Sequence, residues 1–488
     1  MTIQEDNNSK PKTGGINRRH FLGLMGTGAV AGAATLSGCG SSTQTQYDQG
    51  GHHTTEVPTD QMTYRTNPGN GDKVSILGYG CMRWPMKTDE SGKTVVDQEM
   101  VNQLVDYAIK HGVNYFDSSP VYCQGLSEEA TGNALARYPR DSYFVATKCS
   151  NHRIVGANVS DKESYERTLE MYHNSFKYFH TDYIDYYLLH SIGSTPGWGG
   201  TPLDLLYQRF FNNGVIDFLV KEREAGRIRN LGWSFHGDVA VFDHMLQLHD
   251  EGKYHWDFVQ IQMNYLDWSY AAVSNARNVN ASYLYEELAK RNIPVVIMEP
   301  LLGGRLANVP MHVVTRLKQR EPENSIASWA FRFCGTYPMV LSTLSGMSYM
   351  ENLQDNIRSF APLKPLTQEE LDYLEETAGV IASYPTIPCN QCGYCMPCPY
   401  GLDIPAILTH YNKCVNEGNL SESSQDPNYR KARQAFLVGY DRSVPRLRQA
   451  SHCTSCNQCS PECPQRIDIP RQMQMIDNYV ESLKRETL

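Results

Sequence analysis

The chain has 488 residues and a formal net charge of −9. This length predicts two to four domains with ample material for a large core. An acidic chain without a basic stripe excludes nucleic acid as a partner, and nothing after residue 40 has the roughly 18 uninterrupted apolar residues of a membrane span.

The first 39 residues have the features of an export signal. The segment Asn17-Arg18-Arg19-His20-Phe21-Leu22 precedes a weakly apolar run rich in Gly and Ala. This order resembles a twin-arginine signal, and Leu36-Ser37-Gly38-Cys39 resembles a lipobox whose cysteine becomes lipidated. We therefore expect export to the periplasm, as a free protein or a membrane-anchored lipoprotein, with membrane contact only through that lipid. The alternative is a disordered tail with a chance Arg-Arg pair.

Residues 40–61 are polar and predict a flexible linker. From 62 to 378, short β-rich runs alternate with longer amphipathic segments, which is typical of repeated βα units and a parallel sheet. We predict an α/β fold, a closed (β/α)8 TIM barrel. The predicted strands are Val74–Gly78, Asn114–Phe116, Phe144–Thr147, Tyr183–Leu189, Arg229–Trp233, Phe258–Gln262, Pro294–Met298 and Met339–Leu344.

Single polar side chains follow three of these apolar runs, and a tyrosine follows one of them. They are Asp117 with Tyr122, then Lys148, then His190. Since the carboxyl ends of barrel strands meet at one mouth, we expect the four side chains to converge there. A tyrosine of pKa near 10 is a poor proton donor, but a buried ammonium stabilises its phenolate and a carboxylate orients that ammonium. Taken singly, each residue also has an ordinary structural explanation.

These four residues, in this order, resemble the catalytic tetrad of the aldo-keto reductases, and the resemblance runs from about Met62 to about Asn356. It implies an oxidoreductase that interconverts a small-molecule carbonyl and an alcohol, such as a sugar or a related metabolite. In this interpretation Tyr122 is the general acid and base, Lys148 and Asp117 tune it, and His190 orients the carbonyl oxygen.

The same resemblance implies an NADP or NAD site along the later strand ends. Ser234 and Gln262 correspond to the residues that hold the nicotinamide carboxamide, although Phe235 stands where the family commonly has asparagine. The segment from Glu299 to Arg305, with Leu301 and Gly303, resembles the loop over the pyrophosphate. The turn after the eighth strand supplies the candidates for the adenosine phosphates, which are Ser345, Gly346, Ser348 and Asn356.

No basic residue lies between Ser345 and Asn356 to pair with a 2′-phosphate, so the choice between NADP and NAD stays open. Arg305 and Arg358 are alternative cations. Free dinucleotide is not expected outside the cytoplasm, so export leaves two alternatives. Either the dinucleotide is carried out tightly bound, or iron–sulfur clusters replace it as the source or sink of electrons.

Residues 379–488 form a predicted second domain, after a helix that a Thr367–Glu370 capping box opens and that runs to about Ser383. Eight of the 14 cysteines lie here in two runs, each followed by proline. Cys398-Pro399-Tyr400-Gly401-Leu402-Asp403-Ile404-Pro405 repeats as Cys463-Pro464-Gln465-Arg466-Ile467-Asp468-Ile469-Pro470, which indicates an internal duplication. Between the runs, helices are predicted around Ala406–Asn416 and Tyr429–Val438.

The two runs resemble those of two-cluster ferredoxins, in which the last cysteine of each run ligates the other cluster. The resemblance implies two 4Fe–4S clusters in a small, mostly helical ferredoxin-like domain. One cluster takes Cys389, Cys392, Cys395 and Cys463, and the other takes Cys398, Cys453, Cys456 and Cys459. Zinc held by four sulfurs is the alternative.

Three functions remain open at this point. The first is an exported oxidoreductase whose clusters carry electrons to or from a redox partner protein. The second is an ordinary NAD(P)-dependent carbonyl reductase with a structural ferredoxin domain. The third is a barrel that serves only as a docking subunit for electron transfer, against which the presence of both Tyr122 and Lys148 argues.

Overall fold

The computed structural model describes residues 51, 56–156, 158–194 and 199–488. These residues all belong to one compact unit, Gln44–Leu488. The predicted signal of residues 1–39 and most of the predicted linker lie outside the described residues.

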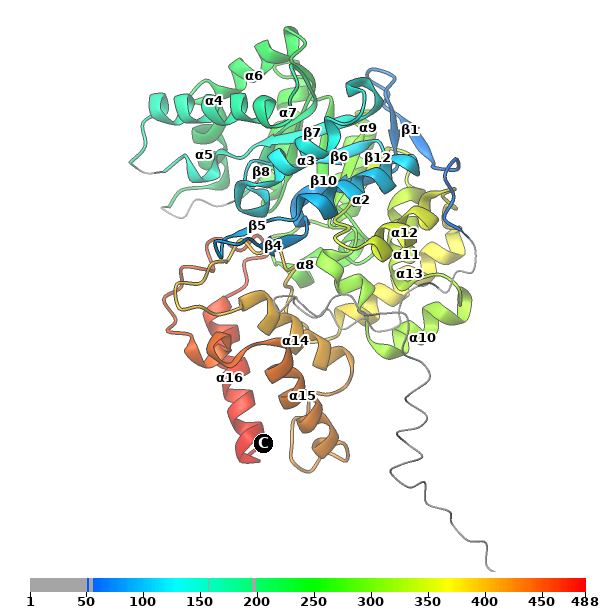
Figure 1. The fold of residues 1–488 in the computed structure, drawn as a ribbon, viewed down its shortest axis with the longest axis vertical. Coiled ribbons are helices and arrows are strands. Elements are labelled where there is room, and N and C mark those ends of the chain that lie inside the picture. Colours follow the sequence, from blue (N-terminus) through cyan, green and yellow to red (C-terminus); the bar gives the residue numbers. More distant parts are fainter. Residues whose placement is uncertain (1–50, 52–55, 157, 195–198) are drawn as a thin grey trace, which may run out of the picture. The chain divides into compact units, whose positions relative to one another are not determined.

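Eight parallel strands close into a barrel in the order β10-β11-β12-β3-β6-β7-β8-β9, which confirms the predicted fold class (Figure 1). The strands are β3 (Leu77–Gly80), β6 (Tyr115–Asp117), β7 (Phe144–Cys149), β8 (Ile184–Ile192), β9 (Ile228–Phe235), β10 (Phe258–Gln262), β11 (Val295–Met298) and β12 (Val340–Ser345).

The first predicted strand, Val74–Gly78, is two strands in the structure. Residues Lys73–Ser75 form β2, which pairs antiparallel with β1 (Tyr64–Thr66), and the barrel strand β3 begins only at Leu77. Hydrogen-bond partners change at Ile76, whose N–H donates to Thr63 whereas its carbonyl accepts from Thr343 of β12. The apolar run continues through this switch, so its pattern alone predicts a single strand.

At least one helix lies between successive strands, and another follows the last strand. The helices around the barrel are α2 (Gln98–Lys110), α3 (Ser127–Leu135), α4 (Asp161–Tyr178), α6 (Val215–Glu224), α7 (Val239–Asp250), α9 (Ala281–Lys290), α11 (Ile326–Thr336) and α12 (Met350–Phe360). A further helix of similar length, α10 (Met311–Arg320), precedes α11, and shorter elements lie beside the ring: β4 (Met86–Thr88), β5 (Thr94–Val96), α5 (Pro202–Leu206) and α8 (Asp267–Ser274). The predicted capping box is confirmed, because Thr367 and Glu370 open α13 (Gln368–Ala382) reciprocally.

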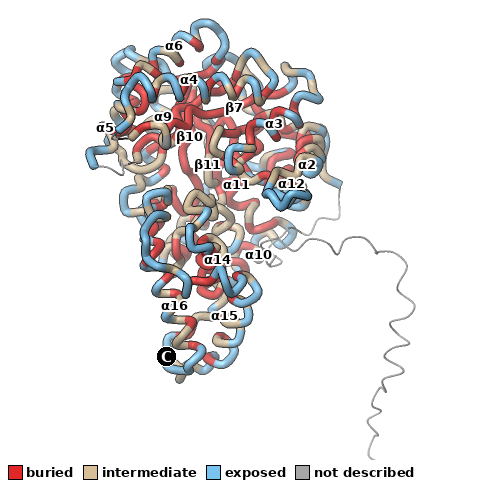
Figure 2. The backbone as a smooth tube through the Cα atoms, turned by 60° about the vertical axis from the view of Figure 1, so that its left-hand side comes forward, coloured by how far each residue is buried: buried red, intermediate tan, exposed pale blue. Residues whose placement is uncertain are grey.

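The barrel is filled by its own side chains. Along β8, Tyr186 and Leu188 belong to the cluster inside the barrel, whereas Tyr187 and Leu189 pack outward against the helices. Figure 2 shows the strands as the most deeply buried part of the backbone. Because the interior is packed, chemistry is confined to the rim at the carboxyl ends of the strands.

A second apolar core, from Ile387 to Leu483, belongs to the C-terminal helices. These are α14 (Ile404–Asn416), α15 (Tyr429–Ser443) and α16 (Ile469–Arg485). The two predicted helices are confirmed as α14 and α15, whereas α16 was not expected. Among the described residues, no helix combines the length and apolar character needed to cross a bilayer.

Candidate functional site

The four predicted tetrad residues meet at the barrel mouth. The Lys148 ammonium pairs with the Asp117 carboxylate and donates to the Ser118 carbonyl at 2.7 Å, and it is fully buried. It also lies 4.8 Å from the centre of the Tyr122 ring. The His190 ring stands edge-on to Tyr122 with their centroids 5.9 Å apart.

Protonation at this mouth is set mainly by burial. Burial, and then the Asp117 charge, raise the pKa of the Tyr122 phenol well above its usual value. Burial, and then the Lys148 charge, lower the pKa of His190 well below its usual value. Across the neutral range Tyr122 therefore carries its proton and His190 is uncharged, so the pair can donate hydrogen bonds to a carbonyl oxygen.

Two buried serines fix the orientation of His190. Ser150 Oγ lies 2.6 Å from His190 Nδ1, and Ser119 Oγ lies 2.8 Å from Ser150 Oγ. When Ser119 donates to Ser150 and Ser150 donates to Nδ1, the His190 proton resides on Nε2, where it can be donated to a substrate. The chain of hydroxyls therefore supports the tautomer that binding of a carbonyl requires.

The predicted dinucleotide residues also reach the rim, and five of their polar side chains already make a hydrogen bond to protein. Ser234 Oγ accepts from the Ser191 N–H at 2.8 Å, and Gln262 Nε2 donates to Asp267 at 2.7 Å. In the turn after β12, Asn356 donates to Ser345 Oγ at 2.9 Å, while Ser348 Oγ donates to the Arg83 carbonyl at 2.6 Å. Gly346 lies against the Arg83 side chain.

The loop after β11 carries the remaining dinucleotide candidates, Glu299, Leu301 and Gly303. Burial raises the pKa of Glu299, with the Arg83 charge opposing it. Gly303 has a φ of +66°, and a Cβ there would lie 2.1 Å from the Asn390 carbonyl oxygen. The segment that holds Asn390 belongs to the cysteine region, so this loop binds protein. In this arrangement the dinucleotide candidates fit their protein neighbours and do not fit a bound dinucleotide.

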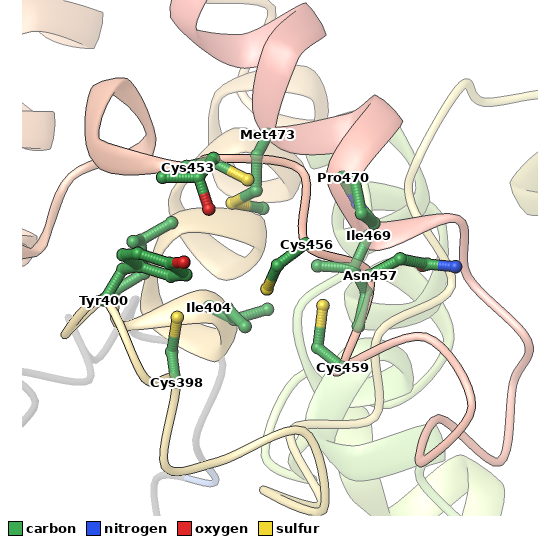
Figure 3. A pocket seen from close by; sticks show the side chains of 12 residues that line it. Cys398, Tyr400, Ile404, Cys453, Cys456, Asn457, Cys459, Ile469, Pro470 and Met473 are labelled. Atoms are coloured by element: carbon green, nitrogen blue, oxygen red, sulfur yellow. The ribbon is translucent and has the colours of Figure 1, made fainter.

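The eight cysteines gather in the two sets that the ferredoxin resemblance implied. Cys398, Cys453, Cys456 and Cys459 line one cavity, and Figure 3 shows their sulfur atoms facing a common space. Cys389, Cys392, Cys395 and Cys463 line another.

The two cavities share Ile404 and Ile469 as walls. These isoleucines are equivalent positions of the internal duplication, and each opens a helix. Asp403 caps α14 by accepting from Ala406 N–H, and Asp468 caps α16 by accepting from Arg471 N–H. The duplication therefore builds two similar cavities on either side of a pair of isoleucines.

The cysteine geometry separates a cluster from a single metal ion. Among the described residues, no three His, Cys, Asp or Glu side chains are arranged as ligands of one ion. Four thiols around an open space instead suit a multinuclear iron–sulfur group, which is larger than zinc. Burial raises the pKa of Cys389 to about 11 and that of Cys392 to about 12, so metal binding must displace their protons.

Several residues that contact the site were not predicted from the sequence. Gln260 donates to Asp117 at 3.1 Å, and its spacing of two from Gln262 on one strand was the available signal. Ser119 and Ser150 each lie two residues after a tetrad member, which was a weaker signal. Asn390 and Gln465 carried no signal, because their partners are distant in sequence.

Comparison with known proteins agrees with the fold and the cysteine region. A family described as "Aldo/keto reductase family" matches residues 76–378, and a "4Fe-4S dicluster domain" matches residues 388–468. Protein tas of Escherichia coli is 25% identical over 61% of this chain and 93% of its own length. L-galactose dehydrogenase of Arabidopsis thaliana is 32% identical over 64% of this chain and 94% of its own length. The solved aldo-keto reductase AKR11C1 from Bacillus halodurans, in its holo form, has a TM-score of 0.48 and 21% identity. That alignment covers 64% of this chain and 96% of the solved chain.

Glu128, behind the mouth, makes folding stability depend on pH. It is buried, it accepts from Thr147 at 2.5 Å and from Ser175 at 2.8 Å, and burial raises its pKa to about 7. The folded chain therefore holds this proton more tightly than the unfolded chain, so the contribution to stability is full below about pH 4 and is lost as the pH rises through about 7. Between these pH values the wild type should lose on the order of 3 kcal/mol in the free energy of unfolding through this group, and Glu128→Gln should not show that loss.

Thermal unfolding at a series of pH values measures this effect. The Glu128→Gln variant should lose less stability than the wild type on going from about pH 4 to about pH 8. Glu129→Gln, at the exposed neighbouring position, should keep the wild-type slope. If stability fell equally with pH in the wild type and in Glu128→Gln, folding would not raise the pKa of the Glu128 carboxyl.

Proposed function

Because the chain belongs to the aldo/keto reductase family, we propose that it interconverts a carbonyl and an alcohol at the barrel mouth, with Tyr122 as general acid and base. Membership makes it an oxidoreductase, and a 4Fe-4S dicluster domain follows the barrel. The observation that carries the proposal is the meeting of Tyr122, Lys148, Asp117 and His190 at one rim. The relative named L-galactose dehydrogenase supports a sugar or a similar metabolite as substrate.

In the reductive direction, the carbonyl carbon takes up two electrons and one proton, which a reductant would supply as a hydride or in single-electron steps. Tyr122 gives its hydroxyl proton to the carbonyl oxygen while His190 Nε2–H holds that oxygen. The buried ammonium of Lys148 then stabilises the phenolate left behind, and Asp117 keeps the ammonium in place. In the oxidative direction the phenolate must form first. Since burial raises the pKa of Tyr122, alcohol oxidation should become faster as the pH rises, whereas carbonyl reduction should not.

Replacing Tyr122 by Phe tests this role. The variant should reduce carbonyls roughly 100-fold or more slowly than the wild type, because the proton donor is gone while the ring remains. Oxidation of reduced methyl viologen by a panel of sugars and simple ketones provides a measurement that needs no dinucleotide. Tyr187→Phe is the matched control, since the Tyr187 hydroxyl is buried without a partner in the described structure. Full activity of Tyr122→Phe would refute the proposal.

We also propose that the C-terminal domain holds two 4Fe–4S clusters. The set of Cys389, Cys392, Cys395 and Cys463 fits one, and the set of Cys398, Cys453, Cys456 and Cys459 fits the other. Such clusters would supply one-electron transfer. Within the second set Cys456 is exposed, as is Tyr400 on the cavity wall, and this supports a redox partner protein that approaches from that side.

Double replacements of cysteine test the assignment. The wild type should contain about eight irons, and Cys398→Ala or Cys456→Ala should each remove about four. The two changes together should remove no more than either one, because both cysteines serve one cluster. Cys398→Ala with Cys392→Ala should remove nearly all iron. Cys414→Ala, a buried cysteine outside both sets, is the control, and additive loss for Cys398 and Cys456 would contradict the assignment.

We further propose that the protein is exported by the twin-arginine route, on the sequence of residues 1–39 alone. Changing Arg18 and Arg19 to Lys preserves charge but removes the arginine pair. Cell fractionation should then find the precursor in the cytoplasm, while Cys39→Ala should still be exported but lack the lipid. An unchanged distribution after the double change would contradict this route.

A further inference from the structure

The cysteine region touches the barrel at its mouth. The contact is made chiefly by Cys389, Asn390 and Gln391, which we name the mouth turn. Asn390 is 4% exposed, whereas Cys389 and Gln391 are half-buried. Cys392, the next residue, lies near Tyr122 and Glu299.

The mouth turn is held on two barrel loops by hydrogen bonds and close packing. Arg83 donates to the Asn390 carbonyl at 2.5 Å, and Gln391 Nε2 donates to the Gly303 carbonyl at 3.4 Å. Asn390 approaches Gly303 so closely that any side chain at residue 303 would overlap its backbone. The space above the loop after β11 is therefore filled by backbone of the mouth turn.

A second contact occupies the next part of the rim. Gln465, which follows the last cysteine of the first set, donates to Gln262 Oε1 at 3.5 Å, and Gln262 donates in turn to Asp267. The oxygen and the nitrogen of the Gln262 side-chain amide thus both have protein partners. Gln465 is 5% exposed, so this contact is shielded from solvent.

Charge at the rim opposes an anionic ligand. Asp267 and Glu299 place carboxyl groups near the mouth, and their ionised forms would repel a pyrophosphate. Two arginines lie near the loop after β11, and both already donate to protein oxygens. Arg83 donates to the Asn390 carbonyl, and Arg305 donates to the Ser274 and Thr386 hydroxyls at 3.4 and 3.2 Å. A pyrophosphate needs N–H groups or cations for its negative charge, so it would have to compete for these two arginines.

We propose that the mouth turn and Gln465 occupy the part of the rim that a nicotinamide dinucleotide would need, so that the full chain binds no free NADH or NADPH. Two electrons for each carbonyl would then arrive one at a time through the proposed 4Fe–4S clusters, and the second proton would come from water. Dinucleotide binding and proton donation by Tyr122 are measured separately. A bound dinucleotide would overturn this proposal and leave the role of Tyr122 intact, and an active Tyr122→Phe variant would overturn that role without a dinucleotide being bound.

Equilibrium dialysis of the anaerobically purified, iron-loaded full chain against NADH and NADPH tests the proposal. The wild type should bind neither at about 1 mM, a concentration that saturates typical dinucleotide enzymes. The double variant Arg83→Ala, Gln465→Ala loosens both contacts and should gain at least about tenfold in affinity. Iron content shows whether each variant keeps its clusters.

Asn416→Ala is the matched control, because Asn416 donates to the Asn308 carbonyl at 2.6 Å, another contact between the same two parts. It should bind no dinucleotide. Saturable binding to the wild type, or a dinucleotide that co-purifies with it, would overturn the proposal. Absence of binding by the double variant, or equal gain in Asn416→Ala, would overturn the role given to the mouth turn.

Discussion

The buried ion pair of Lys148 and Asp117 is the interaction on which the mouth depends. An ammonium withdrawn from water is costly unless every donor finds an acceptor. Here Asp117 and the Ser118 carbonyl receive it, and Gln260 satisfies the other carboxylate oxygen. Loss of one partner from such a pair typically costs roughly 3–5 kcal/mol. The strands β6, β7 and β10 are thereby tied together at the point where Tyr122 sits.

Much of this arrangement could be predicted from sequence because it obeys periodic rules. Strand ends in a parallel barrel converge, so Asp117, Lys148 and His190 could be placed at one mouth from their position after apolar runs. The cysteine sets were implied by the resemblance of the two duplicated runs to those of two-cluster ferredoxins. The first strand was misjudged at Ile76, where a continuous apolar run changes its hydrogen-bond partners without any change of pattern.

Contacts between loops that are far apart in the chain could not be predicted from the sequence. Asn390 and Gly303 lie far apart in the chain and have no shared periodicity, yet their backbones meet. The dinucleotide residues were assigned by resemblance to a barrel that was considered alone. The C-terminal domain contacts the same rim and forms hydrogen bonds with some of its polar groups. The sequence pattern of residues 62–378 does not show which of these groups have such partners.

The mouth turn contains Cys389 and is followed at once by Cys392, so the residues that seal the barrel also line the first cysteine cavity. The shape of the first cysteine cavity and the position of the loop after β11 are therefore coupled through three consecutive residues. If the proposed cluster fills that cavity, it would hold the mouth turn from one side while Arg83 and the Gly303 carbonyl hold it from the other.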